Sequence, residues 1–323
     1  MCYNRILCLG DSRLTGDLPL NTGEYATMKT MYAMLVGFAC VAMVFTSCAT
    51  AQEASAAAAE GAPNAEKLGW HLGCQAYSFN RFTFFEAVDK NQSLGLHYIE
   101  AYPGQKYSPE KPDATFDHNM SEELRQEALA KLKAADIKVV NYGVVGLSAD
   151  EAESRKVFDF AKAMGIQTIC SEPAPEAMDT VEKLADEYGI NVAIHNHPKP
   201  SRYWNPDTVL EAVEGRSKRL GACADTGHWA RSGIVPLDAL KKLEGRIISF
   251  HFKDLNEFGK REAHDVPWGT GICDVDALLK EVQRQGLNDI VFSIEYEHNW
   301  DNSVPEIAQC VAYFDKVAAE LAK

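Results

Sequence analysis

The sequence lacks three features that would assign it at once to a functional class. None of its nine cysteines forms a CxxC pair, so the cysteine spacing implies no disulfide framework. The formal net charge is -14, which argues against a nucleic-acid partner, because nucleic-acid binding requires a basic face. No GxGxxG follows the first predicted strand, so a dinucleotide-binding fold has no support. A hydrophobic content of 46% over 323 residues is nevertheless enough for a large core.

The N-terminal region contains one apolar run of about fifteen residues between Lys29 and Cys48. It is short for a membrane span, and the lysine before it and the small residues after it are typical of a secretory signal. Phe45-Thr-Ser-Cys48 resembles a bacterial lipobox, in which the cysteine is lipidated after cleavage. We expect residues 1–27 to be a start-site artefact, 28–47 a lipoprotein signal peptide and 48–67 a flexible Ala-rich tether. The protein is then expected to be exported to the periplasm and anchored through lipid on Cys48, the alternative being a transmembrane anchor.

Eight short apolar runs alternate with helix-like segments over residues 68–323, close to the ~250 residues typical of a (β/α)8 barrel. The predicted strands span residues 72–78, 97–102, 138–143, 167–172, 191–197, 221–225, 247–254 and 289–295. The predicted helices span residues 83–94, 121–135, 149–164, 175–188, 206–213, 236–243 and 305–321. This alternation favours parallel βαβ units, and a count of eight strands favours a closed TIM barrel of the α/β class.

The last five predicted strands all end on residues that can bind a metal. These residues are Glu172, His195 with His197, Asp225 with His228, His251, and Glu295 with Glu297. Because side chains at the C-terminal ends of barrel strands face a common cavity, we expect them to lie near one another. Mixed carboxylate and imidazole ligands suit one divalent ion such as Mn, Zn, Co or Mg.

Four motifs resemble those of the xylose isomerase-like TIM barrels. They are Asp225-Thr-Gly-His228-Trp-Ala, Phe250-His251-Phe-Lys253-Asp254, Val266-Pro-Trp-Gly269-Thr-Gly271 and Ile294-Glu295-Tyr. This superfamily includes sugar (phosphate) isomerases and epimerases, inosose dehydratases and endonuclease-four-type DNA repair enzymes. The endonuclease branch carries extra histidine ligands where this chain has Glu100 and Asn141.

The resemblance implies that Asp225, His251 and Glu295 are metal ligands. A fourth ligand is usually the glutamate of an Ile-Glu-Asn-His run, which reads Ile194-His195-Asn196-His197 here. His195 therefore replaces that glutamate, and Glu172, one strand earlier, is an alternative source of the missing carboxylate. His228 matches the histidine that faces the substrate in relatives.

The expected function is a metal-dependent sugar isomerase or epimerase that removes a proton alpha to a carbonyl and forms an enediolate. One alternative is a lyase or hydratase acting on 3-keto sugars or 3-keto-glycosides, and another is a non-catalytic sugar-binding lipoprotein. The catalytic candidates are Glu172, Glu295, His228 and Lys253, with a surface salt bridge to Asp254 as the other interpretation of Lys253. The candidates for binding a small sugar or keto-sugar are His197, Trp229, Trp268 and Tyr77. No nucleic-acid partner is expected, and membrane contact only through the lipid.

Overall fold

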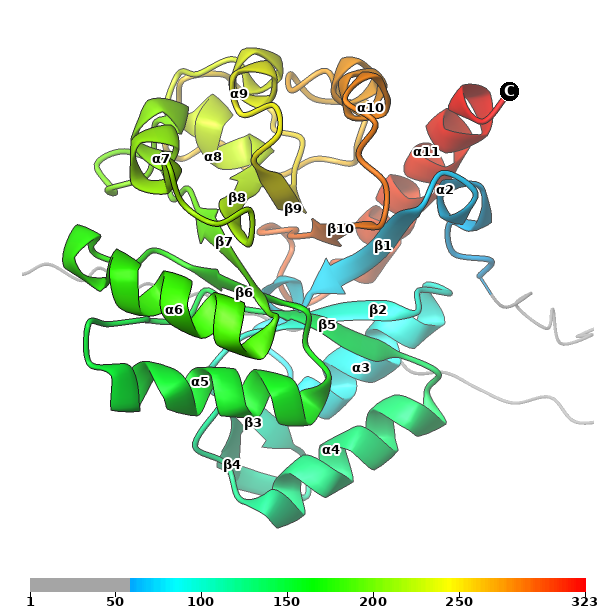
Figure 1. Cartoon of the computed structure of the whole chain (residues 1–323). Helices are drawn as coiled ribbons and strands as arrows, with labels where there is room; N and C mark the ends of the chain where they lie inside the picture. Colours follow the sequence, from blue (N-terminus) through cyan, green and yellow to red (C-terminus); the bar gives the residue numbers. More distant parts are fainter. Residues whose placement is uncertain (1–58) are drawn as a thin grey trace, which may run out of the picture. The chain divides into compact units, whose positions relative to one another are not determined.

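The computed structural model describes residues 59–323, which form a closed barrel of eight parallel strands surrounded by helices (Figure 1). The strands are β1 Trp70–Gln75, β2 Tyr98–Ala101, β5 Lys138–Tyr142, β6 Thr168–Ser171, β7 Asn191–His195, β8 Leu220–Asp225, β9 Ile247–Phe252 and β10 Ile290–Ile294. Their order around the barrel is β1-β10-β9-β8-β7-β6-β5-β2, and β2 also pairs with β1. The predicted (β/α)8 TIM barrel is confirmed.

Ten α-helices are present in the described part of the chain. They are α2 Pro63–Glu66, α3 Phe84–Ser93, α4 Glu122–Ala134, α5 Glu151–Met164, α6 Met178–Tyr188, α7 Pro206–Val213, α8 Thr226–Arg231, α9 Pro236–Lys242, α10 Val275–Arg284 and α11 Val304–Leu321. Helix α3 begins with a capping box between Thr83 and Glu86. Helix α5 ends at Gly165, whose φ of 76° is easily adopted only by glycine and turns the chain toward β6.

Several elements were not expected from the sequence, and the short helix α8 is one of them. The segment between β2 and α4 contains an antiparallel hairpin, β3 Gln105–Ser108 with β4 Lys111–Phe116, where the sequence predicted only a loop. Helix α10 follows a long loop after β9, and its N-cap Asp274 lies in the left-handed region with φ 53°. Helix α2 lies in the segment assigned to the tether, and the backbone and side chain of Asn64 both donate to Asp315 of α11.

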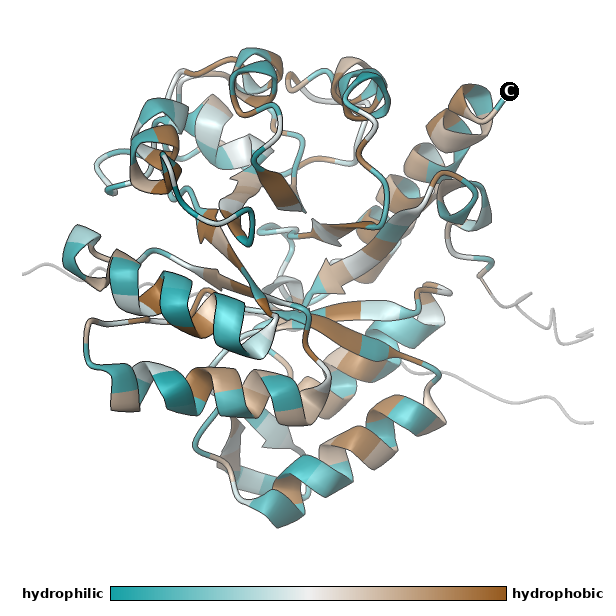
Figure 2. Cartoon of the chain, viewed as in Figure 1, coloured by the Kyte–Doolittle hydropathy of each residue, from teal (hydrophilic) through white to brown (hydrophobic). Residues whose placement is uncertain are grey.

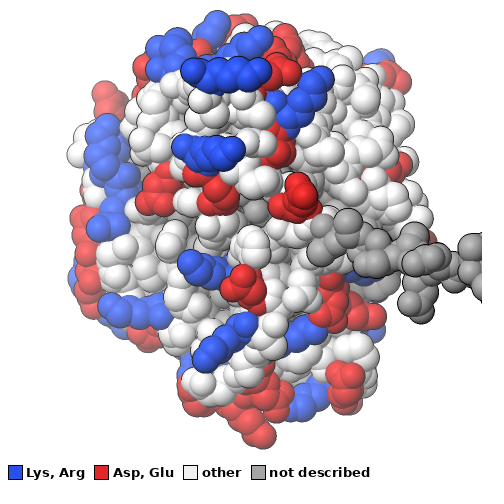
Figure 3. Space-filling view, turned by 90° about the vertical axis from the view of Figure 1, so that its right-hand side faces the viewer, with Lys and Arg blue, Asp and Glu red and all other residues white. Residues whose placement is uncertain are grey.

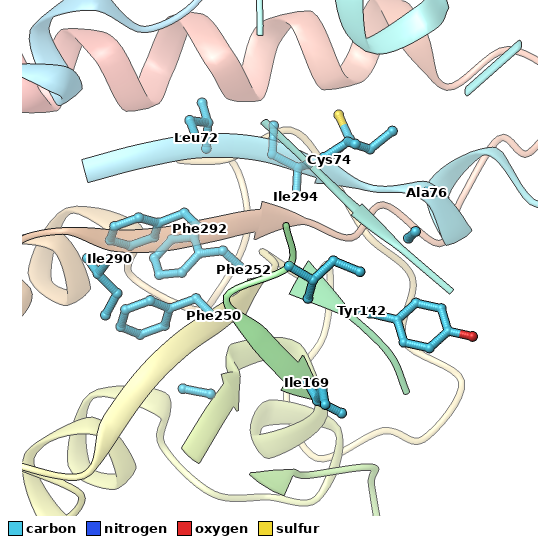
Figure 4. Close-up of a cluster of buried hydrophobic side chains, with 14 of the residues drawn as sticks. Leu72, Cys74, Ala76, Tyr142, Ile169, Phe250, Phe252, Ile290, Phe292 and Ile294 are labelled. Carbon is cyan, nitrogen blue, oxygen red and sulfur yellow. The ribbon is translucent and has the colours of Figure 1, made fainter. Parts of the chain in front are cut away.

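Alternation along the strands separates the hydrophobic core from the polar interior of the barrel. Phe250 and Phe252 of β9 pack against Phe292 of β10, and the Phe250 and Phe292 rings stack with centroids 4.7 Å apart (Figure 4). Phe292 in turn meets Phe314 of α11. Because successive strand residues face opposite sides, His251 is turned into the barrel. Figure 2 shows the hydrophobic strands at the centre and hydrophilic residues on the outer helices.

The surface of the barrel carries charges of both signs. On the face shown in Figure 3, acidic and basic side chains are interspersed. No helix within residues 59–323 is both long and apolar enough to cross a membrane. The predicted artefact, signal peptide and lipidated Cys48 lie outside the described residues.

Candidate metal centre and active site

A cavity of about 270 Å³ opens at the C-terminal ends of the barrel strands. Five of the residues singled out in the sequence, Tyr77, His197, His228, Glu295 and Glu297, are among those that line it. They lie in the segments that directly follow β1, β7, β8 and β10, and closure of the parallel barrel brings these segments to one end. The polar residues that end those strands are therefore brought together as predicted.

His195, the last residue of β7, is held from behind by Glu172. Its Nδ1 lies 3.1 Å from Glu172 Oε1, and the same carboxylate oxygen accepts hydrogen bonds from the backbone N–H and Nδ1 of His197. Burial alone would raise the pKa of Glu172, but the hydrogen bonds from His195 and His197 lower it to about 2. An ionised carboxylate only accepts, so His195 Nδ1 carries a hydrogen and Nε2 is left to face Asp225 Oδ2 at 3.5 Å.

Asp225 ends β8 and caps α8. Its Oδ1 accepts a hydrogen bond from the backbone N–H of His228 at 2.6 Å, which leaves Oδ2 directed at the cluster. Burial would raise the pKa of this carboxyl, but His228 and Lys253 hold it well below its usual value. Asp225 is therefore a fully buried, ionised carboxylate with one oxygen committed to the helix and the other to the site.

His251 of β9 is oriented by a carboxylate that sequence reasoning did not assign to the site. His251 Nε2 lies 2.8 Å from Oε1 of Glu100, which is held in turn by Ser293 Oγ at 2.6 Å and Asn141 Nδ2 at 3.2 Å. This contact places the hydrogen on Nε2 and turns Nδ1 toward Glu295 Oε2 at 3.1 Å. A histidine that binds a metal through one ring nitrogen usually donates the hydrogen of the other nitrogen to a carboxylate.

Lys253 contributes a positive charge to the centre of the site. Its side chain is 0% exposed, and Nζ lies 3.1 Å from Asp225 Oδ2, 2.8 Å from Glu295 Oε2 and 2.9 Å from Glu297 Oε2. Burial would lower the pKa of Lys253, but these carboxylates raise it well above its usual value, so it is an ammonium. The surface salt bridge with Asp254 that we considered is not formed.

Asp254 has a structural task instead. Its buried carboxylate accepts hydrogen bonds from the backbone N–H groups of Leu255, Gly269, Gly271 and Cys273, at 2.9 to 3.0 Å. The chain from residue 255 to 273 is thereby tied to the end of β9. Gly271 is required there, since a Cβ would lie 2.3 Å from Asp254 Oδ1.

These residues fit a divalent metal ion. Three buried polar atoms of the cluster, His195 Nε2, Asp225 Oδ2 and His251 Nδ1, make no well-aligned hydrogen bond among the described residues. The approaches of Lys253 Nζ to Asp225 and of Glu295 to His251 are charge contacts only. One ligand atom each from His195, Asp225, His228 and Glu295 lie within 4.8 Å of one another, and Glu295 links His251 to this group. Orphaned nitrogen and oxygen atoms around an excess of negative charge form a donor set suited to Zn or Mn. The group contains His195 and not Glu172, and it therefore favours His195 as the ligand that takes the place of the usual glutamate.

Two predicted substrate contacts do not reach the cavity. Trp229 is 1% exposed and Trp268 is 2% exposed, and Trp268 packs against Phe252 and Phe314 in the outer core layer. Both large rings are buried among hydrophobic side chains and do not line the cavity. Tyr77 is 40% exposed at the cavity rim, where its ring meets Tyr102 and Trp300 edge-on.

The sequence analysis did not assign two residues, Glu100 and Arg231, to the site. Glu100 is a charged residue within the apolar strand β2, a pattern that could have identified it. Arg231 has the appearance of an ordinary cation in the last turn of α8, and only the fold reveals its contacts with His228, Glu297 and Asp265.

The contact between Glu172 and His195 gives a first testable prediction. Glu172→Gln should weaken metal binding by ~10- to 100-fold, the usual cost of losing a carboxylate behind a ligating histidine. Competition with a chromogenic chelator measures the affinity. Glu176→Gln, at an exposed position in the adjoining 3-10 helix Pro175–Ala177, is the matched control and should bind like the wild type. An unchanged affinity in Glu172→Gln would show that Glu172 does not orient His195.

Comparison with known proteins places the chain in a family. The family described as xylose isomerase-like TIM barrel matches residues 88–316. An uncharacterised protein from Parabacteroides distasonis ATCC 8503 is 34% identical, with a TM-score of 0.63 over 77% of this chain and 99% of its own. A D-tagatose 3-epimerase-like protein is 17% identical, with a TM-score of 0.60 over 78% of this chain and 100% of its own. The IOLI protein, solved with a bound zinc atom, is 17% identical, with a TM-score of 0.57 over 78% of this chain and 99% of its own.

None of the curated proteins matches the chain. The matched residues make up more than half of the sequence, and the chain belongs to the xylose isomerase-like TIM barrel family.

Proposed function

We propose that this protein is a divalent-metal-dependent sugar isomerase or epimerase that removes a proton alpha to a carbonyl group. The observation that carries the proposal is the double position of Glu295, which belongs to the cluster of ligand atoms and also lines the cavity. A carboxylate placed in this way lies between the metal site and any molecule in the cavity. The family and the zinc-containing neighbour support the same assignment.

The chain's own residues supply most of the required chemistry. Burial would raise the pKa of Glu295, but Lys253 and His251 hold it well below its usual value, so Glu295 is ionised and can accept a proton. Lys253 provides positive charge where negative charge develops on the substrate, and His228 faces the cavity as a polar contact. A divalent ion bound by His195, Asp225, His251 and Glu295 would polarise the substrate carbonyl.

The cavity favours a sugar that carries no phosphate. None of the described residues that line it is a lysine or an arginine. Lys253 and Arg231 contact Glu297 in its wall, but both cations are buried and already paired with carboxylates. Phosphate recognition normally uses such cations or a helix N-terminus. The exposed ring of Tyr77 and the partly buried ring of Trp300 beside it instead offer apolar faces to a sugar ring. Export through the predicted signal peptide at residues 28–47 would place the enzyme where free sugars occur.

A lyase or hydratase acting on a 3-keto sugar or keto-glycoside is the second candidate, and one observation favours it. Epimerisation by two bases needs a second free carboxylate, for which Glu297 is the other acid on the cavity wall. Glu297 Oε2 already accepts from Lys253 Nζ at 2.9 Å and from Arg231 Nη1 at 2.6 Å. Glu295 is paired with one of these cations, Lys253, where Glu297 is paired with two. Elimination of a beta substituent needs only one base, and Glu295 is the candidate for it.

The test is incubation of the metal-loaded protein with free and 3-keto sugars in deuterated water. We expect deuterium to enter the carbon next to the carbonyl, followed by a new sugar if the reaction is isomerisation or epimerisation. Release of an aglycone from a keto-glycoside would select the lyase. Exchange confined to phosphorylated sugars would contradict the proposed substrate class, and neither exchange nor release from any sugar would contradict the proposed chemistry.

Glu295→Gln provides the matching variant. It keeps the size of the side chain but removes the charge, so we expect exchange to fall by ~10²-fold or more, in the range attributed to general acid–base catalysis. Circular dichroism should show an intact barrel. Glu262→Gln, an exposed position in the loop after β9, should retain the wild-type exchange rate.

A further inference from the structure

Arg231 is a buried arginine that contacts two carboxylates and one histidine beside the cavity. It is the last residue of α8, and its side chain is 8% exposed. Its guanidinium lies 2.6 Å from Glu297 Oε2, 3.1 Å from Asp265 Oδ2 and 3.0 Å from His228 Nδ1. The first two contacts are ion pairs, while the third joins the guanidinium to a ring nitrogen one helical turn earlier.

The contact with His228 determines which ring nitrogen carries the hydrogen. A guanidinium has five donors and no acceptor, and it stays protonated in proteins. His228 Nδ1 must therefore accept, so in the neutral ring the hydrogen lies on Nε2, the nitrogen 3.6 Å from Asp225 Oδ2. His195 has the opposite arrangement, because Glu172 accepts from its Nδ1. The two rings have centroids 5.6 Å apart, yet Glu172 places the hydrogen of His195 on Nδ1 and Arg231 places the hydrogen of His228 on Nε2.

We propose that Arg231 is a positioning residue that fixes His228 as an N–H donor to the substrate and removes it from the set of metal ligands. A nitrogen that carries a hydrogen cannot bind a metal, so His228 is excluded although it lies in the same cluster as His195, Asp225 and Glu295. His228 lines the cavity, where its Nε2–H donates a hydrogen bond to a substrate oxygen that gains negative charge. The hydrogen stays on His228 throughout. The role toward substrate rests on the proposed function, whereas the tautomer does not.

Nitrogen-15 NMR of the full chain loaded with zinc tests the tautomer without any substrate. Long-range correlations distinguish an Nε2–H ring from an Nδ1–H ring, and the spectrum of His228→Gln identifies the His228 signals. We expect Nε2–H in the wild type and in Arg231→Lys, whose ammonium also only donates. Arg231→Met should lose the preference. Asp265→Asn, which removes a partner of Arg231 but not of His228, should keep the wild-type tautomer.

Zinc stoichiometry and kinetics complete the test. His228→Gln should still bind one zinc ion per chain. Arg231→Met should lower kcat by ~10²-fold, the scale of losing one preorganised donor, with partial recovery in Arg231→Lys. An Nδ1–H ring or zinc bound to His228 in the wild type would overturn the proposal. Both are measured on the wild-type protein, so the test holds even if Arg231→Met does not fold. A correct tautomer with no sugar turnover would instead refute the proposed function alone.

Discussion

Asp225→Asn should abolish metal binding and turnover while leaving the barrel folded. The asparagine Oδ1 can still accept from the backbone N–H of His228, so the cap of α8 is kept. The charge that faces His195 Nε2 and Lys253 Nζ is lost. Because Asp225 is a proposed ligand, its loss should exceed the ~10- to 100-fold effect of a residue behind a ligand. Isothermal titration with zinc or manganese and the deuterium-exchange assay measure the two losses.

The matched control is Asp254→Asn, at the buried carboxylate that follows Lys253. Its oxygens hold four backbone N–H groups and none of the cluster residues. This variant should lower the unfolding temperature and still bind the metal. If Asp225→Asn bound the ion with wild-type affinity, Asp225 would not be a ligand.

Lys253→Met should produce a protein whose stability depends on the metal. Removing the ammonium leaves Asp225, Glu295 and Glu297 in the interior without their shared cation. Breaking a buried ion pair in this way typically costs ~3–5 kcal/mol of unfolding free energy. A divalent ion restores positive charge at the same carboxylates, so it should stabilise the variant more than the wild type.

Urea denaturation with EDTA and with excess zinc measures this difference directly. In EDTA the variant should unfold at a clearly lower urea concentration, and zinc should close most of the gap. Lys280→Met, at an exposed pair with Asp276, is the control and should change stability little in either condition. Equal zinc shifts in the variant and the wild type would show that Lys253 and the metal do not share these carboxylates.

The sequence predicted the barrel and the convergence of its strand ends for one physical reason. At the end of β9, hydrophobic Phe250 and Phe252 alternate with His251 and with Lys253, the residue after the strand. The period of two assigns the first pair to the helices and the second to the interior. This pattern is local, so it is legible without the fold. The closed order of eight strands then places those ends around one cavity.

Other features depend on contacts between distant segments and were beyond sequence reasoning. Trp268 looked available to a sugar, but the loop held by Asp254 carries it into the core beside Phe314. The partnership of Glu100 with His251 joins residues 151 positions apart, on opposite sides of the chain's midpoint. The hydrogen bond from Arg231 to His228 exists only because α8 is capped at Asp225 and turns once before Arg231.

The most direct test of the metal centre is the anomalous diffraction of crystals grown with manganese or zinc. We expect one strong peak within bonding distance of His195 Nε2, Asp225 Oδ2, His251 Nδ1 and a Glu295 oxygen, with Lys253 beside it and His228 outside the ligand set. A peak bound by Glu172 with His197, or by Cys170 with Cys223, or no peak at all at saturating metal, would contradict it.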